Sequence, residues 1–414
     1  MKKKELYVFN GAGRAATYGI GTYIEQLKKA LKDTEWNLTI VYLYAQKNEI
    51  EIMEKEEYKQ ISIPFPAGNQ TNAGQYYAKI ITYILKDIIS KDKKIEYIFH
   101  LNFMTDSYFV KCLKKHFRCK AILTVHYTDW SLSLNGDVHK LKKLLQKPEK
   151  ELKKNVQEKL IVKGFKEDVK MIERVDRLVC VARHTWDVFH KVGVVSAGKT
   201  EIINNALEDI YKPLSNKRKK YLRSKYYLNQ NTRIVLFAGR LDEVKGIAWL
   251  IRAFRKVLVT NPNTRLFLIG DGSFNVWLKE SADIWPQVTF TGLVEKKKLD
   301  ELYSIADIGV VCSLHEEFGF VAIEMMMHAL PIIVTKTGGL DEIVEDKVSG
   351  LKVPVRTIKG KRQVDVRLLT EKMRFMLDNP VTAKEIGEIG RKRFLEKFEL
   401  SVFKEKILDL YKNL

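Results

Sequence analysis

Short apolar segments alternate with amphipathic segments along the chain of 414 residues, and this alternation restricts the possible folds more than any other feature. Amphipathic helices are expected at about residues 21–31 and 77–90, between apolar segments of strand length. Strands are expected at residues 5–10, 38–44, 97–102, 121–126, 178–182, 200–204, 233–238, 265–269, 288–291, 308–312 and 331–335. Strands that alternate with helices predict an α/β protein with parallel sheets covered by helices on both faces.

Composition excludes several classes of protein. Hydrophobic residues make up 45% and charged residues 30%, as in ordinary globular proteins. Apolar runs are far shorter than the roughly 20 residues that a spanning helix requires, and the basic start at Met1–Lys4 precedes too short an apolar run for a secretory signal. The four cysteines form no C-x-x-C pair, which indicates free thiols in a reducing compartment. We therefore expect a cytoplasmic protein, and the absence of D-x-D and H-E-x-x-H motifs predicts no metal.

The net charge of +21 is uneven, since residues 1–200 hold 36 Lys and Arg against 23 Asp and Glu, which gives +13. This balance indicates an anionic partner, such as a membrane surface or a phosphorylated substrate, or merely a solvated surface. Nucleic acid is not expected, because its short binding motifs are missing. Residues 139–170 carry 11 Lys and 5 acidic residues, with Leu152, Val156 and Leu160 at helical spacing. This segment is either a surface helix packed on the first domain or a basic amphipathic element that binds a membrane or an acidic acceptor.

Glycines and cations follow two of the expected strands. Gly19 and Gly21 precede the first helix, where a glycine-rich turn lets a ligand approach the backbone, although an ordinary tight turn fits as well. Arg240 and Lys245 follow the strand at residues 233–238, at an edge of the sheet where α/β proteins bind ligands. Both cations suit phosphate oxygens, and the alternative is a pair of surface cations beside acidic neighbours.

Two glutamates eight residues apart form the sharpest signal. Glu316 comes just after the strand at residues 308–312, and Glu324 lies in the following helix. Gly319 keeps the backbone thin between them. A carboxylate at such a position can accept hydrogen bonds from both ribose hydroxyls, and the apolar neighbours of Glu324 predict that it is half-buried and needs partners.

The segment Leu314–Met326 resembles the E-x7-E signature of the retaining glycosyltransferases of family 4. Further segments resemble that family in the same order: Gly239-Arg240-Leu241 with Lys245-Gly246, Ile269–Gly272, Phe290–Val294, Thr337–Val344 and Ser349–Leu351. The resemblance implies a GT-B fold, with two Rossmann-like domains that face each other across a cleft. It implies an acceptor-side domain at 1–208 that includes the basic segment at 139–170, a nucleotide-sugar domain at 209–393, and a helix at 394–414 that returns to the first domain.

The resemblance also implies roles for individual residues. His126 takes the place of the family's histidine at a strand end, but Tyr127 follows it where the family has Asp or Asn. The segment Tyr18–Leu27 resembles a bacterial subgroup associated with radical-SAM peptide maturation. Residues expected to hold the donor are Gly19, Gly21, Gly239, Arg240, Lys245, Gly292, Val294, Phe318, Gly319 and Glu324, and those expected to act in catalysis are His126, Arg240, Lys245 and Glu316.

The expected reaction is a metal-independent, retaining transfer of a sugar from a UDP- or GDP-linked donor. No cofactor is expected. Arg240, Lys245 and helix N-termini are expected to neutralise the charge of the phosphates. The acceptor is a saccharide, a lipid-linked intermediate or a peptide, with possible association at the inner face of the membrane. The alternatives are a non-enzymatic anion-binding protein, or another GT-B enzyme such as a sugar-nucleotide epimerase or a phosphorylase.

Overall fold

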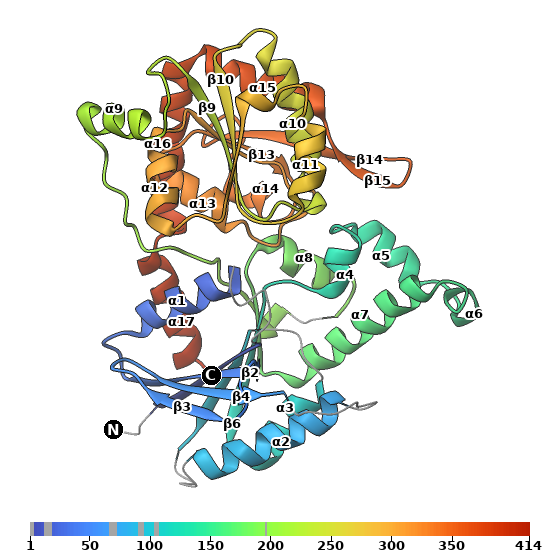
Figure 1. The fold of residues 1–414 in the computed structure, drawn as a ribbon. Helices are drawn as coiled ribbons and strands as arrows, with labels where there is room; N and C mark the ends of the chain where they lie inside the picture. The colour runs from blue at the N-terminus through green and yellow to red at the C-terminus, as the bar shows by residue number, and fades with distance from the viewer. Residues whose placement is uncertain (1–3, 12–18, 66–72, 90–94, 103–106, 195–196) are drawn as a thin grey trace. The chain divides into compact units, whose positions relative to one another are not determined.

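The computed structural model describes residues 4–11, 19–65, 73–89, 95–102, 107–194 and 197–414 (Figure 1). Contacts within the chain divide it into two compact units. Unit 1 consists of Met1–Ala206 with Leu400–Leu414, and unit 2 consists of Leu207–Glu399. Among the described residues, no helix is both long and apolar enough to cross a bilayer.

Unit 1 is built on an eight-stranded sheet in the order β3-β4-β2-β1-β5-β6-β7-β8, as traced through the described residues. Neighbouring strands are parallel except for the antiparallel pair β3 and β4. The strands are β1 (Lys4–Gly11), β2 (Trp36–Ala45), β3 (Glu51–Glu54), β4 (Lys59–Pro64), β5 (Tyr97–Leu101), β6 (Cys119–Val125), β7 (Arg177–Cys180) and β8 (Thr200–Ile202). Six of them fall where the sequence predicts strands, and β3 and β4 add an edge that was not predicted.

Helices cover both faces of this sheet. They are α1 (Gly19–Leu31), α2 (Ala73–Ile88), α3 (Ser107–His116), α4 (Asp129–Ser133), α5 (Val138–Leu145), α6 (Glu149–Leu152), α7 (Val156–Arg174), α8 (Arg183–Lys191) and α17 (Leu400–Lys412). Side chains alternate along a strand, so Phe99 joins the core under α2 and α3, while its neighbour His100 faces α17 and bonds the hydroxyl of Tyr411 at 2.7 Å.

The helix that returns to unit 1 is shorter than expected. The sequence predicts one helix over 394–414, whereas α17 begins at Leu400. Residues 394–397 are instead the last turn of α16 (Pro380–Lys397), which ends because Phe398 leaves helical geometry at φ −128°.

The basic segment at 139–170 is not a single helix. Pro148 is the N-cap of α6, and the side chain of Asn155 accepts a hydrogen bond from the amide of Glu158 at 3.2 Å and so caps α7. The stripe of Leu152, Val156 and Leu160 is therefore divided between two helices. Leu152 is buried in a separate hydrophobic core. The other members come from α4 and its C-cap, α5, α7 and α8: Trp130, Leu134, Leu141, Leu144, Ile161, Val162, Phe165 and Val188.

Unit 2 has a seven-stranded sheet in the order β11-β10-β9-β12-β13-β14-β15. The strands are β9 (Arg233–Ala238), β10 (Thr264–Ile269), β11 (Val288–Gly292), β12 (Ile308–Val311), β13 (Ile332–Lys336), β14 (Leu351–Ile358) and β15 (Lys361–Val364). All neighbours are parallel except β14 and β15, an antiparallel hairpin that was not predicted.

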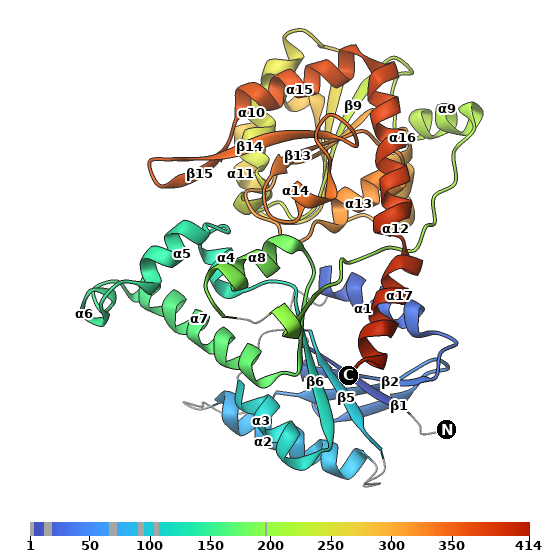
Figure 2. The ribbon, with the colours of Figure 1, turned by 180° about the vertical axis from the view of Figure 1, so that it is seen from behind.

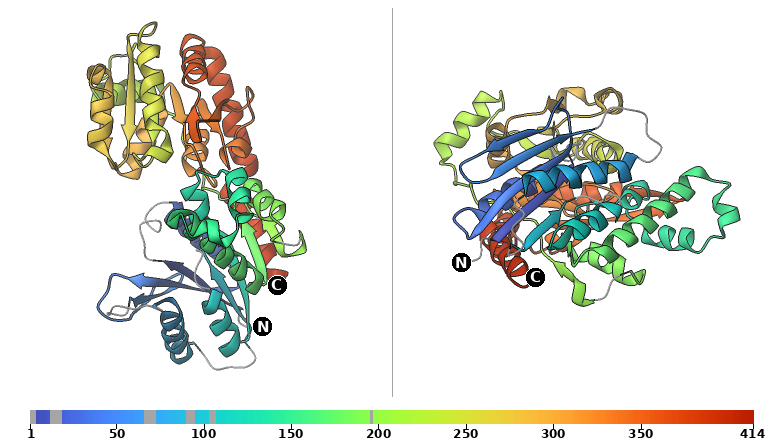
Figure 3. Two further views of the ribbon diagram at one scale, coloured as in Figure 1. Left: turned by 90° about the vertical axis from the view of Figure 1, so that its right-hand side faces the viewer. Right: turned by 90° about the horizontal axis from the view of Figure 1, so that it is seen from below.

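Two layers of helices enclose the sheet of unit 2, as Figures 2 and 3 show. The helices α10 (Ile247–Leu258), α11 (Phe274–Glu280) and α15 (Val366–Asp378) pack on one face. The other face carries α9 (Asn216–Lys225), α12 (Lys296–Ile305), α13 (Phe320–Met327) and α16. The short helix α14 (Leu340–Ile343) follows β13. The expectation of two Rossmann-like α/β units is confirmed.

Candidate active site

The strand order of unit 2 creates a point at which the chain reverses its direction across the sheet. Strands β9 and β12 are neighbours, but the chain leaves β9 toward β10 on one side and leaves β12 toward β13 on the other. Loops that diverge from the carboxyl ends of two such strands leave a crevice in which α/β proteins bind ligands. The loop after β9 carries Arg240 and Lys245, and the loop after β12 carries Glu316.

Lys245 and Glu316 form an ion pair at this crevice. The hydroxyl of Ser313 donates a second hydrogen bond to the same carboxylate oxygen at 2.9 Å. The side chains of Lys245 and Glu316 are only 19% and 17% exposed. Burial alone would raise the pKa of Glu316, but the Lys245 charge and both hydrogen bonds outweigh it and hold this pKa below its usual range. The site therefore presents a fixed, ionised carboxylate beside a fixed ammonium.

Two glycines allow the loop after β12 to lie close to the loops after β9 and β13. Gly246 follows Lys245 at φ +76°, and a Cβ atom there would lie 2.0 Å from the carbonyl oxygen of Cys312. Gly338 lies at φ +48°, and a Cβ atom there would lie 1.8 Å from the carbonyl oxygen of Glu316. Only glycine fits both the backbone conformation and the space. The next amide, that of Gly339, donates to the Glu316 carbonyl at 2.9 Å.

Arg240 lies on the same loop as Lys245 but has a different partner. Its guanidinium contacts the carboxylate of Asp242 at 3.1 Å, and both side chains are about one-third exposed. A phosphate that binds Arg240 must therefore displace or share this surface contact.

Glu324 lies on α13 and is held by two residues of α12. Tyr303 donates its hydroxyl hydrogen to one carboxylate oxygen at 2.9 Å, and the Lys296 ammonium contacts the other at 3.2 Å. Lys296 also contacts Asp300 at 3.2 Å. These partners were not predicted, although Lys296 and Tyr303 stand two helical turns apart on one face of α12.

The remaining donor-side residues lie at strand ends or helix starts. Gly239 directly follows β9, and Gly292 is the last residue of β11; both have positive φ. Gly319 is the N-cap of α13. Val294 is half-buried just beyond β11. The ring of Phe318 is buried against Phe320 and Phe398, so only its backbone can face a ligand.

In unit 1 the predicted His126 lies directly after β6, where it is half-buried. Its Nε2 lies 3.1 Å from Oδ1 of Asn102, and its ring packs edge-on against Tyr23. Burial lowers the pKa of His126 to about 3, so the ring is neutral at physiological pH.

Two buried asparagines at the same sheet edge were not predicted. Asn10 on β1 and Asn102 after the neighbouring β5 are 1% and 0% exposed, and among the described residues nothing accepts a hydrogen bond from their side-chain Nδ2 atoms. A buried amide donor without a partner is costly, so these groups are candidates to bind a ligand. Gly19 and Gly21 belong to α1 rather than to a turn before it.

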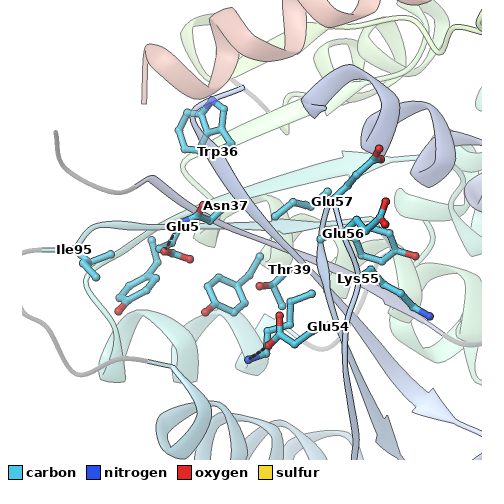
Figure 4. A pocket seen from close by; sticks show the side chains of 14 residues that line it. Glu5, Trp36, Asn37, Thr39, Glu54, Lys55, Glu56, Glu57 and Ile95 are labelled. Atoms are coloured by element: carbon cyan, nitrogen blue, oxygen red, sulfur yellow. Dashed lines mark hydrogen bonds and ion pairs between the residues drawn. The ribbon is translucent and has the colours of Figure 1, made fainter. Parts of the chain in front are cut away.

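A separate pocket of about 430 Å³ lies at the amino ends of the strands of the same sheet, opposite the strand ends that carry Asn10, Asn102 and His126 (Figure 4). Its lining includes Glu5 and Trp36, at the amino ends of β1 and β2, and the turn between β3 and β4. Two of its carboxylates, those of Glu54 and Glu57, form ion pairs with lysines. It contains none of the predicted site residues.

The fold defines a protein with two Rossmann-like units, the second of which carries the ion pair of Lys245 and Glu316 at its reversal point. A family model described as "Glycosyl transferases group 1" matches residues 218–393, which are therefore a glycosyltransferase group 1 domain. An uncharacterised glycosyltransferase of Methanocaldococcus jannaschii is 36% identical over 129 residues, which are 30% of this chain and 33% of that protein. The matched stretches span only 33% to 50% of the length of the first curated relatives.

Solved structures resemble the chain over its whole length. Sucrose-phosphate synthase of Thermosynechococcus elongatus superimposes with a TM-score of 0.76 at 21% identity, over 99% of this chain and 98% of that one. The Anabaena protein HepE in complex with UDP and glucose superimposes with a TM-score of 0.73 at 15% identity, over 100% of both chains. These likenesses show the fold, and the expected GT-B architecture is confirmed.

Proposed function

We propose that this protein is a retaining, metal-independent glycosyltransferase of family 4 that moves a sugar from a UDP- or GDP-linked donor to an acceptor. The observation that carries the proposal is the ion pair of Lys245 with Glu316 at the reversal point of a glycosyltransferase group 1 domain. A diphosphate needs a cation, and a sugar with oxocarbenium character needs a carboxylate. The complexes of HepE with UDP and glucose support a nucleotide-sugar donor.

The donor would be held by unit 2. Lys245 and Arg240 would bind the diphosphate oxygens, together with the amide groups at the start of α13, where the N-cap Gly319 offers no side-chain acceptor. Glu324 would accept hydrogen bonds from the ribose hydroxyls. The backbone near Gly292 and Val294 would contact the base.

In the chemical step, the anomeric carbon would lose its bond to the diphosphate and gain a bond to the acceptor on the same face of the sugar. The bond to the diphosphate oxygen breaks, the acceptor oxygen attacks, and the leaving phosphate takes the acceptor's proton. Glu316 would bind donor-sugar hydroxyls and stabilise the positive charge, while Lys245 meets the negative charge on phosphate. His126, which is neutral, would donate or accept a hydrogen bond near the reacting carbon.

The acceptor would be approached from unit 1. The amide of Asn102, which contacts His126, and the amide of Asn10 have Nδ2 donors without a partner in the described parts of the chain, and these donors suit a hydroxyl-bearing or anionic acceptor. A saccharide, a lipid-linked intermediate and a peptide all fit that chemistry. We also propose that the protein acts in the cytoplasm and associates with the membrane surface.

The Glu316→Gln variant tests this proposal. It keeps the size of the side chain but removes the charge, and we expect kcat/KM to fall by about 10² to 10³. The matched control is Glu371→Gln, which removes one partner of an exposed ion pair with Arg367 and should leave activity unchanged. Full activity of Glu316→Gln would contradict the assigned role.

Two outcomes with the wild-type protein would point to the alternatives. Conversion of the nucleotide sugar without any acceptor would indicate an epimerase. A folded protein that binds no nucleotide or nucleotide sugar and has no turnover would indicate an anion-binding protein.

A further inference from the structure

The helical insertion of unit 1 carries an exposed apolar pair on a basic helix. Val156 and Leu160 lie one turn apart on α7 and are 71% and 60% exposed. The inner side of the same helix is already packed, because Ile161, Val162 and Phe165 belong to the buried core of the insertion. The described part of unit 1 therefore leaves most of the surface of Val156 and Leu160 uncovered.

Lysines surround this pair. Lys159 and Lys163 each stand three residues after one member of the pair, and both are exposed. Within the described parts of the chain, these two and six more lysines of α5, α6 and α7 have no ion-pair partner: Lys140, Lys142, Lys143, Lys150, Lys154 and Lys166. We call Val156, Leu160 and the lysines of residues 150–166 the α7 patch.

The position of the patch suits a broad, flat partner. Figures 1 and 2 show α6 and the start of α7 at the outer end of the insertion, far from the sheet of unit 1, and Figure 3 shows the same projection from below. Two adjacent aliphatic side chains at such an end can enter the boundary between lipid headgroups and acyl chains.

The composition of the patch favours lipid over protein. Protein interfaces are poor in lysine and built around aromatic anchors, whereas lysines that border a small apolar pair match a surface of anionic headgroups. A shallow apolar pair alone buries too little area for stable attachment, so the lysines supply the remaining attraction.

We propose that the α7 patch docks the protein on an anionic phospholipid bilayer, with Val156 and Leu160 inserted and the neighbouring lysines on the headgroup phosphates. This inference does not depend on the transfer chemistry, because docking is measured without donor or acceptor. It provides the means by which an enzyme could reach an acceptor held at a membrane.

The test is co-sedimentation of the full chain with vesicles. Vesicles of phosphatidylcholine with phosphatidylglycerol should bind the protein at low salt, and binding should weaken as salt rises because headgroup attraction is screened. Vesicles of phosphatidylcholine alone should bind it weakly. Equal binding to both vesicle types would overturn the proposal.

Variants separate the patch from the general positive charge. Val156→Asp with Leu160→Asp should abolish binding, whereas Val259→Asp with Val381→Asp, at residues of unit 2 that are 80% and 72% exposed, should not. All four residues are exposed, so folding should survive, which circular dichroism verifies. Unchanged binding of the Val156/Leu160 variant would show that the patch does not insert.

The lysine variants complete the test. Lys159→Gln with Lys163→Gln should weaken binding about 25-fold, since each lysine near an anionic surface contributes about a fivefold factor. The control, Lys217→Gln with Lys220→Gln on the basic helix α9, should have no effect. If wild-type protein ignores the vesicles but binds polyglutamate through Lys159 and Lys163, the patch recognises an acidic polypeptide and the bilayer proposal is wrong.

Discussion

The carboxylate of Glu316 is largely buried, and the Lys245 charge together with the hydrogen bonds from Lys245 and Ser313 keeps it ionised. Its sequence position, at a strand end and eight residues before Glu324, was enough to single it out. Its partner Lys245 was predicted as a phosphate ligand, but not as the group that keeps Glu316 ionised. Sequence spacing gives the strand end; it does not give the direction of two side chains that are 71 residues apart.

Removal of the Lys245 charge should change the acid side of the pH–rate profile. In Lys245→Met the cation is gone, burial dominates, and the pKa of Glu316 should rise from its depressed value. The ionised form would then be lost at a higher pH as the solution is acidified, and activity would fall earlier. A profile of kcat/KM against pH for both proteins measures the shift, and superimposable acid limbs would contradict this account.

Lys296 and Tyr303 hold the carboxylate of Glu324 and should act on donor binding rather than on the chemical step. We expect Lys296→Met to raise the KM for the donor about tenfold, about the loss of one charge-assisted hydrogen bond, with kcat nearly unchanged. Lys297→Met, at the next and exposed position, is the control. A fall in kcat at constant KM would place Lys296 in the chemical step instead.

At the scale of helices and strands, most of the central strands were predictable because each is a buried apolar run. The edges were not: β3 has an alternating half-exposed pattern over four residues, and β15 is similarly short. The insertion was misjudged as one helix because the apolar spacing of Leu152, Val156 and Leu160 continues across Asn155, whose side chain caps a new helix. The apolar spacing shows which residues face the core, but the positions of capping residues determine where one helix ends and the next begins.

Gly338 is expected to be the more sensitive of two glycines with similar backbone angles. Gly338→Ala places a methyl group against the Glu316 carbonyl, whereas Gly360→Ala, at φ +73°, meets nothing within 4 Å. The second variant should lose about 1 kcal/mol from conformational strain alone, and the first considerably more. Thermal unfolding of both variants measures the difference, and equal losses would show that the loop after β12 can move away.

The contact between β5 and α17 should weaken as the pH falls. Burial lowers the pKa of His100 to about 3, while in the unfolded chain it titrates near 6.5. Between these values the unfolded state binds more protons, so stability falls as pH decreases below 6.5, by about 1.4 kcal/mol per pH unit. His100→Gln should remove this part of the slope in chemical unfolding of unit 1, and an unchanged slope would assign it to other groups.

At the scale of the whole molecule, the donor should stabilise the chain without a metal. In a thermal-shift panel of UDP, GDP, ADP and their sugars with EDTA present, one nucleotide should stand clear of the others. A ligand at 100 times its Kd stabilises its unit by about 2.7 kcal/mol. A thermal shift that appears only after magnesium is added would contradict metal-independent binding. The nucleotide that gives the largest shift identifies the base of the donor.

The chain leaves unit 1 after Ala206 and re-enters it at Leu400. The 193 residues Leu207–Glu399 are therefore made between the main part of unit 1 and its helix α17. At ordinary rates of synthesis, the ribosome needs about 10 to 40 s to make that insert. During this interval His100 on β5 cannot form its hydrogen bond with Tyr411, and the ring of Tyr23 cannot pack against Phe403. Until α17 has been made, the residues of unit 1 that it covers, Tyr23 among them, therefore lack this cover.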